Sequence, residues 1–286
     1  MHPAFQLLLL VSCLLPGCEA DKPTLEAPSV LAVETTSPQE PERQAVSKFE
    51  QGNYTETIEQ AQKILKQKPD SLNALMLIGE ASFMKGDVHQ SIESFDRMIE
   101  LNPQLEPRLW QRGLALYYAD RFQDGKEQFE THQTYNRQDV ENAVWHLLCH
   151  SKIVGLEKAR EEFIPITQDS RVPMKQIHQL FGGSGSVEDV FQAATSTPAL
   201  GRSKAFQIYY AHLYVGLYYD MVGDQEKSLA EMRAAAKINP LAKDLLMGRV
   251  ADVHLLIRKA DEPIGQGGAG KSQTDKQEKP PADLGH

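Results

Sequence analysis

The sequence predicts an all-α protein, a solenoid of stacked helical hairpins with a segment outside the fold at each end. Residues 69–102 align with residues 103–136 without a gap, so that small, aromatic and proline residues recur 34 positions apart. Glycine followed by Asp or Asn recurs where a helix would turn back on itself. The segments 19–44 and 261–286 hold many proline or glycine residues and no aromatic residue. Together these observations favour a repeat protein over an ordinary globular bundle.

The 34-residue unit needs particular residue types. Gly79 and Gly113 fall in the middle of the predicted first helix, and Phe95 and Phe129 fall in the second. A glycine inside a helix costs about 1 kcal/mol relative to alanine, so we expect close approach of the partner helix to offset that cost. We expect the aromatic rings to fill the space between neighbouring hairpins. This period, with a small residue in the first helix and a closing proline, is the tetratricopeptide pattern.

Turn residues mark where each helix ends. Gly86 precedes an aspartate between the two predicted helices, and glycine accepts the left-handed conformation that ends a helix. Pro103 then stops the second helix, because proline restricts the residue before it. A degenerate first repeat over 45–69 has Gly52 in the place of Gly86, and its short first helix suits a terminal capping unit. The sequence therefore predicts tandem tetratricopeptide repeats over 45–139.

The pattern weakens over residues 140–200, where we expect divergent helical hairpins. The first of them places Ala159 and Phe163 in its second helix. A later helix is expected to begin after Ser186, whose side chain can form a capping box with Asp189.

The repeat pattern returns over residues 201–260, which predict a C-terminal tetratricopeptide repeat and a capping helix. Gly216 and Gly223 take the mid-helix and turn positions, and Asn239 precedes the closing proline. The last predicted helix, over 241–260, is apolar on one face and is expected to cover the last hairpin.

Residues 1–17 form an apolar stretch that is too short to cross a bilayer as a stable helix and has the length of a secretory signal peptide. The Leu-Pro-Gly-Cys sequence that ends at Cys18 resembles a bacterial lipobox. That resemblance implies that Cys18 becomes the new N-terminus and carries a lipid such as palmitate. An ordinary cleaved signal peptide and an uncleaved anchor, with Cys18 incidental to both, are the alternatives.

Residues 18–44 are acidic and rich in proline, and residues 261–286 are rich in glycine and proline. Such segments bury too little apolar surface to repay the entropy of ordering, so we expect both to be disordered. As a flexible coil the first would reach on the order of 30 Å, which suits a tether between a membrane and the folded part.

The order of these parts resembles the NlpI-type tetratricopeptide lipoproteins of bacterial envelopes. The resemblance includes the lipobox, the tandem repeats, the AVWHLLCHSK hairpin (143–152), the QLFGG segment (179–183) and the late repeat around YAHLYVGLYYDMVGDQEKSL (210–229). It implies a non-enzymatic, homodimeric scaffold, lipid-anchored in the cell envelope and facing the periplasm, on the inner or the outer membrane. Such scaffolds bring envelope proteases or peptidoglycan hydrolases to their substrates.

In tetratricopeptide stacks the first helices line a concave groove, so partner binding is expected there. Large aromatic residues on an exposed groove are suited to anchor a bound peptide or helix. The residues expected on the groove are Asn73, Met76, Glu80, Phe83, Met84, Pro107, Trp110, Leu114, Tyr117 and Tyr118. The alternative is that these side chains pack against the tether, the C-terminal helix or a dimer partner. Met76 and Glu80 stand where chaperone-binding repeats need basic and Asn residues, so we do not expect capture of a C-terminal carboxylate.

His146, Cys149 and His150 are the one cluster with the residue types of a metal site or a Cys-His nucleophile. Their spacing places them near one helical face, but a buried helix face needs the same spacing. We therefore expect no catalytic residue, metal or cofactor, with a metal-dependent or Cys/His enzyme as the alternative. The glycine-rich stretch 182–186 lacks the Gly-Lys-Ser/Thr of a phosphate loop and is interpreted as a turn.

The formal net charge of −9 argues against nucleic-acid binding, which needs a basic surface. It also disfavours electrostatic attachment to anionic lipid. Protein partners are therefore expected.

Overall fold

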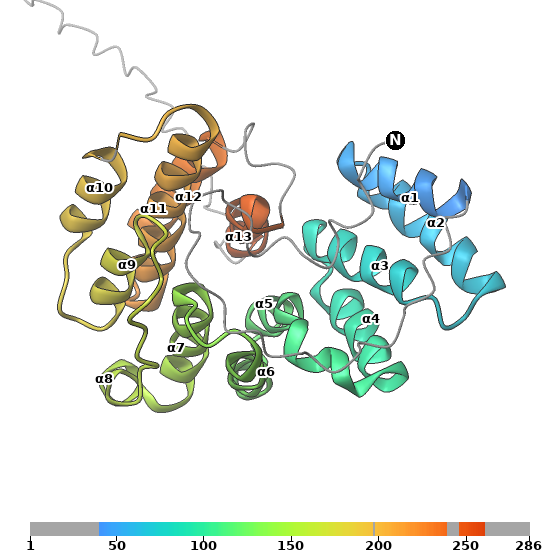
Figure 1. Ribbon diagram of the computed structural model, residues 1–286, viewed down its shortest axis with the longest axis horizontal. Coiled ribbons are helices and arrows are strands. Elements are labelled where there is room, and N and C mark those ends of the chain that lie inside the picture. The colour runs from blue at the N-terminus through green and yellow to red at the C-terminus, as the bar shows by residue number, and fades with distance from the viewer. Residues whose placement is uncertain (1–39, 197, 239–245, 261–286) are drawn as a thin grey trace, which may run out of the picture.

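The computed structural model describes residues 40–196, 198–238 and 246–260. Every regular element in these ranges is a helix, and successive helices pair as hairpins along a curved stack (Figure 1). In chain order the helices are α1 (Glu40–Glu50), α2 (Tyr54–Gln67), α3 (Leu72–Met84), α4 (Val88–Leu101), η1 (Pro103–Arg108), α5 (Trp110–Tyr118), α6 (Phe122–Tyr135), α7 (Val140–Val154), α8 (Leu156–Glu161), α9 (Met174–Phe181), α10 (Val187–Ser196), α11 (Gly201–Met221), α12 (Gln225–Ile238), η3 (Leu246–Arg249) and α13 (Val250–Ala260). The leader, Cys18 and the C-terminal tail lie outside the described residues. Within the described ranges, no helix combines the length and the apolar composition needed to span a bilayer.

The predicted turns between paired helices are present. Gly86 has φ +78°, a conformation that glycine adopts without strain, and the Asp87 side chain accepts a hydrogen bond from the first turn of α4. Gly52 and Gly223 have positive φ at the equivalent places. In the third hairpin Asp120 takes this position with φ 55°. The turn prediction is confirmed.

The mid-helix glycines receive the aromatic rings of the second helices. A Cβ placed on Gly79 would lie 2.6 Å from Cε1 of Phe95, and one on Gly113 would lie 2.5 Å from Cζ of Phe129. The close approach predicted at the mid-helix glycines is therefore present. The atoms nearest to each glycine belong to the aromatic ring of the second helix of the same hairpin, and not to the backbone of that helix. Phe129 also stacks on Trp145 of the next hairpin, with ring centroids 6.4 Å apart. The aromatic residue thus joins its own hairpin to its neighbour, as expected.

Elements late in the chain also match their predictions. Gly216 keeps the close approach, but its partner is Met232, with Cε 3.0 Å from an ideal Cβ. Ser186 and Asp189 form the predicted capping box, in which the Asp189 N–H donates to Ser186 Oγ and the Ser186 N–H donates to Asp189 Oδ2. Asn239 lies outside the described residues.

Helix boundaries depart from the expectation in three places. The last helix, expected over 241–260, is an α-helix only over Val250–Ala260 and follows the 3-10 helix η3 in the described residues. Helix α1 begins at Glu40, inside the segment expected to be a disordered tether, with acidic side chains in its first turn that favour a helix start. Helix α8 ends at Glu161, so Phe163 lies beyond it instead of inside the second helix of a hairpin. Pro165 favours this end, because in a continued helix it would have no N–H to donate to the carbonyl of Glu161 and its ring would clash with that carbonyl. The Phe163 ring stacks instead on His178 of α9, with centroids 4.4 Å apart.

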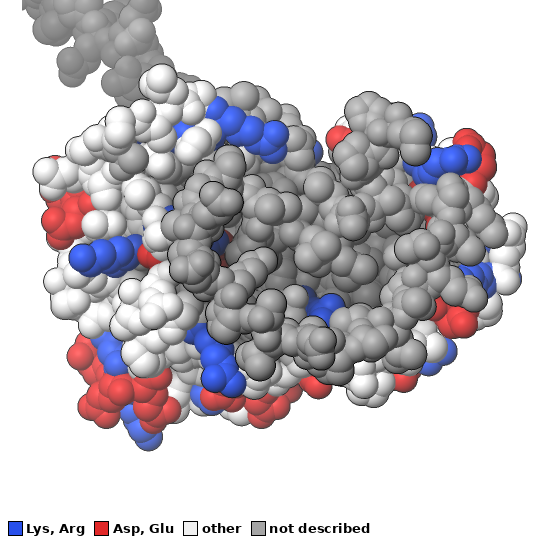
Figure 2. Space-filling view, viewed as in Figure 1, with Lys and Arg blue, Asp and Glu red and all other residues white. Residues whose placement is uncertain are grey.

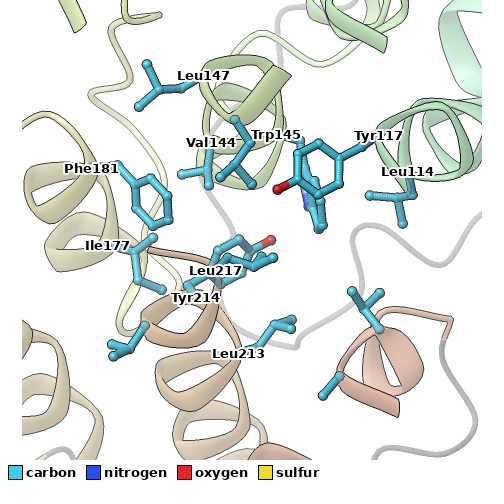
Figure 3. Packing of buried hydrophobic residues seen from close by; sticks show 14 of the residues in the cluster. Leu114, Tyr117, Val144, Trp145, Leu147, Ile177, Phe181, Leu213, Tyr214 and Leu217 are labelled. Carbon is cyan, nitrogen blue, oxygen red and sulfur yellow. The ribbon is translucent and has the colours of Figure 1, made fainter. Parts of the chain in front are cut away.

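The final helix lies on the concave side of the stack. In Figure 1, α13 is seen between the arm formed by α1–α4 and the arm formed by α9–α12. It packs against α12, as expected of a helix that covers the last hairpin, and it also contacts α3. The core continues from the middle hairpins into the late repeat: Tyr117 and Trp145, from α5 and α7, lie opposite Tyr214 and Leu217 of α11 (Figure 3).

Candidate functional site

Most of the residues expected on an open groove are buried. Met76, Glu80, Phe83, Leu114, Tyr117 and Tyr118 are buried, Met84 and Trp110 are half-buried, and Asn73 is exposed. Pro107 is half-buried in η1, where its carbonyl accepts a hydrogen bond from Nδ1 of His132 at 2.7 Å. The expectation of a row of exposed aromatic anchors is therefore corrected, because Trp110 is the one aromatic residue of this set that keeps substantial exposure.

Two of the buried aromatic residues lie under the C-terminal helix, one of the alternatives that the sequence left open. The hydroxyl of Tyr118 is 3.1 Å from Nδ1 of His254. The guanidinium of Arg258 lies over the rings of Tyr117 and Tyr118, with Cζ 5.9 and 5.8 Å from their centroids. The Tyr117 hydroxyl donates to Asp220 of α11 at 2.8 Å. Helix α13 and the late repeat thus close this part of the concave face.

The path of α13 follows the turns of the first three hairpins. Arg249, just before α13, has its guanidinium Cζ 5.6 Å from the centroid of the Tyr54 ring at the first turn. Cδ2 of Leu256 lies 2.9 Å from an ideal Cβ on Gly86 at the second turn. Arg258 forms a long ion pair with Asp120 at the third turn, 3.9 Å apart. The turn residues at positions 52, 86 and 120 are one repeat apart, so the repeat spacing provides the contact sites for this helix.

Burial changes the chemistry of the polar groups under α13. It raises the pKa of Tyr117 and of Tyr118 well above the ordinary value of 10. It lowers the pKa of His254 to about 4. Asp220 acts against that decrease and Arg258 adds to it. At neutral pH Tyr117, Tyr118 and His254 are therefore uncharged, and Arg258 places a positive charge beside them.

The other part of the concave face contains a buried carboxylate. Glu80 is 7% exposed and accepts one hydrogen bond, from Nε2 of Gln111 at 3.2 Å. Burial raises the pKa of Glu80 to about 7. Among the described residues, no ion pair includes Glu80, and the amide oxygen of Gln111 is buried without a hydrogen-bond partner. The sequence indicated Glu80 as a groove residue but not that Gln111 would be its hydrogen-bond partner.

His146, Cys149 and His150 do not converge on one point. Sγ of Cys149 packs against Gly125 of α6 and would lie 2.9 Å from a Cβ placed on that glycine. Burial raises the pKa of the Cys149 thiol. Nε2 of His146 faces Glu130 at 3.3 Å, and Nε2 of His150 faces a second glutamate. In the described part of the chain, no three His, Cys, Asp or Glu side chains are placed to hold a metal ion. A buried thiol with a raised pKa is also a poor nucleophile.

A cluster of charged residues that sequence reasoning missed joins α7 to the segment before α9. Arg171 forms ion pairs with Asp139, Glu141 and Asp169 at 2.5–2.6 Å. The hydroxyl of Tyr214 donates to Glu141 at 2.7 Å. The partners of Arg171 from α7 are about 30 residues away in sequence, and no local pattern marks them. We interpret this cluster as structural, because each charged group in it has a partner.

Charge is mixed on the face seen in Figure 2. Acidic and basic side chains are interspersed over the described residues, most densely around α8, where Glu157, Lys158, Arg160 and Glu161 follow one another. This distribution gives a nucleic acid no continuous basic surface on the described part of this face.

Comparison with known proteins identifies the repeat type. Residues 43–106 match the family model described as tetratricopeptide repeat. A crystal structure of a tetratricopeptide repeat protein from Parabacteroides merdae ATCC 43184 is similar, with a TM-score of 0.46 and 11% sequence identity. That similarity covers 73% of this chain and 83% of the other. The described part of the chain is an all-α stack of helical hairpins, and its residues 43–106 match a repeat type that is associated with protein binding.

Proposed function

We propose that this protein is a non-enzymatic scaffold that binds helices or extended peptides of protein partners on its concave face. The observation that supports the proposal most directly is that this face already accommodates a helix of its own chain, α13. The rings of Tyr117 and Tyr118 and the glycine turns form the seat of α13, which places His254 and Arg258 against them. These contacts are of the kind that a partner helix uses in a groove. The exposed Asn73 and the half-buried Trp110 and Met84 belong to the same face and remain accessible.

We further propose that the scaffold is attached to an envelope membrane through lipid on Cys18, faces the periplasm and acts as a homodimer. The lipobox-like sequence and the order of the parts support this proposal. Envelope proteases or peptidoglycan hydrolases are the partners that the resemblance favours. A self-associating protein whose concave face binds only a second copy is the competing possibility.

The test uses the full chain in a bacterial envelope, followed by crosslinking and affinity capture. Trp110→Ala is expected to reduce capture of partners, because Trp110 is the accessible aromatic residue of the concave face. Tyr135→Ala is the matched control, since Tyr135 is an exposed aromatic residue at the end of the second helix α6. Equal capture by both variants would contradict a concave binding site. Loss of dimers alone, measured by sedimentation, would instead favour the self-associating protein.

Attachment is tested separately. Cys18→Ser is expected to abolish incorporation of labelled palmitate and to release the protein from the membrane fraction. Unchanged labelling would overturn lipid attachment at Cys18 and leave the binding proposal intact.

A further inference from the structure

Glu80 and Gln111 form a polar site on the concave face that is separate from the seat of α13. The contacts of α13 with this face lie near the turn end of the hairpins, at Gly86 and Tyr118. Glu80 lies more than one helical turn from Gly86 along the chain, and Gln111 lies two turns from Tyr118. The hydrogen bond of Glu80 runs between α3 and α5, so the site joins the first helices of two consecutive repeats.

The site has more hydrogen-bond acceptors than donors. An ionised carboxylate offers about four acceptor positions, and Glu80 receives one hydrogen bond. Gln111 is 8% exposed, and its buried amide oxygen has no partner. Leaving such groups unsatisfied costs free energy, typically about 1–3 kcal/mol for each neutral group and more for a charged one. The raised pKa of Glu80 is consistent with a negative charge that the folded chain does not compensate.

The neighbouring cation of the chain is engaged elsewhere. Arg112 follows Gln111 in sequence, but its guanidinium bonds to Asp96 at 2.6 Å and to Gln128 at 3.0 Å. These contacts direct it towards the second helices and away from Glu80. Among the described residues, no cation of the chain forms an ion pair with Glu80, so a basic group of a partner would have no competitor there.

We propose that the concave face receives a Lys or Arg side chain from a helix or peptide of a protein partner, and that Glu80 and Gln111 hold it. An ammonium or guanidinium group carries several N–H donors and a positive charge, and it satisfies both the carboxylate and the free amide oxygen. Trp110, next to Gln111, supplies a half-buried aromatic surface for the aliphatic part of such a side chain. The inference rests on the proposed function and specifies the chemistry of its partner.

The experiment places a photo-crosslinking amino acid at position 73, which is exposed and lies on the same helical face as Glu80, seven residues away. The full chain is crosslinked in its native membrane, the captured segment is sequenced, and a peptide of that sequence is synthesised. Its Kd is measured with the unmodified protein, with Glu80→Gln and with Glu93→Gln. Glu93 is an exposed acidic residue of α4 and serves as the matched control.

We expect the captured segment to contain a Lys or Arg, and we expect its replacement by Gln to weaken binding at least tenfold. Glu80→Gln is expected to weaken binding by a similar factor. Combined with the change in the peptide, it should raise the Kd little more than either change alone. Glu93→Gln is expected to leave the Kd unchanged. Captured segments without an essential basic residue, or equal Kd for Glu80→Gln and unmodified protein, would overturn this site and leave the scaffold proposal standing. The absence of any crosslinked protein would overturn both.

Discussion

Tyr118 and His254, which are 136 residues apart in sequence, meet at 3.1 Å between the hydroxyl and Nδ1. This contact ties the first helix of the third hairpin to α13, the last helix of the described residues. Oγ of Ser228 in α12 lies 3.4 Å from the other ring nitrogen, Nε2, so the imidazole connects three helices. A substitution of His254 is therefore expected to alter the packing of the concave face and of the C-terminal repeat together.

Acid is expected to weaken this junction. The pKa of His254 is lowered from 6.5 to about 4 in the folded protein, so the unfolded chain binds the proton more readily. The stabilisation is fully present above pH 6.5 and is lost as the pH falls towards 4. A difference of this size corresponds to about 3 kcal/mol. Urea unfolding at pH 7.5 and 5.0 should show a loss of about 2 kcal/mol of this stabilisation, because pH 5.0 is still one unit above the folded pKa. The pH dependence should be smaller in His254→Gln. Identical pH dependence in the two proteins would contradict the prediction.

Glu80→Gln should stabilise the protein at high pH. The pKa of Glu80 is raised to about 7, so ionisation opposes folding increasingly as the pH rises from about 4.5 through 7. At pH 8 the variant is expected to gain about 1–3 kcal/mol, and at pH 4 it should gain little, because the folded protein then holds Glu80 protonated. Denaturation at the two pH values measures the effect. A loss of stability at pH 8 would show that the carboxylate is already compensated within the fold.

Equivalent glycines should tolerate alanine differently. Gly113→Ala places a methyl group against the buried ring of Phe129 and is expected to cost about 1–3 kcal/mol. Gly216→Ala meets the flexible end of Met232, which can move, and is expected to cost less than Gly113→Ala. Thermal unfolding of both variants makes the comparison. A larger loss for Gly216→Ala would contradict the role given to the aromatic ring.

Arg171→Met should be strongly destabilising at neutral pH, because it leaves three carboxylates without their cation. The expected loss is about 3 kcal/mol, the lower end for a broken buried pair, since the side chain of Arg171 is 34% exposed. The loss should shrink in acid as the carboxylates bind protons. Arg97→Met, which removes an exposed pair with Glu100, is the control and should change stability by less than about 1 kcal/mol.

The features that repeat could be predicted from the sequence, and those that depend on distant contacts could not. Gly79, Phe95 and Gly86 recur at a fixed spacing, and a fixed spacing implies the same surroundings in each hairpin. Trp110 and Tyr117 look alike in sequence as groove aromatics, yet one is half-buried and the other is buried. The difference arises from contacts with α13 and α11, more than 80 residues further along the chain, which the residues of α5 do not indicate by themselves.

The position of α13 also affects how the molecule comes apart and how it forms. In a linear array each repeat touches only its neighbours, so the end repeats fray first and unfolding spreads inward. Here α13 contacts α12 and α3 and reaches the first three turns, so the two ends of the array lose their structure as one cooperative unit. Because these contacts span most of the sequence, they raise the contact order and slow folding. During synthesis, the concave face can close only after the residues of α13 have left the ribosome.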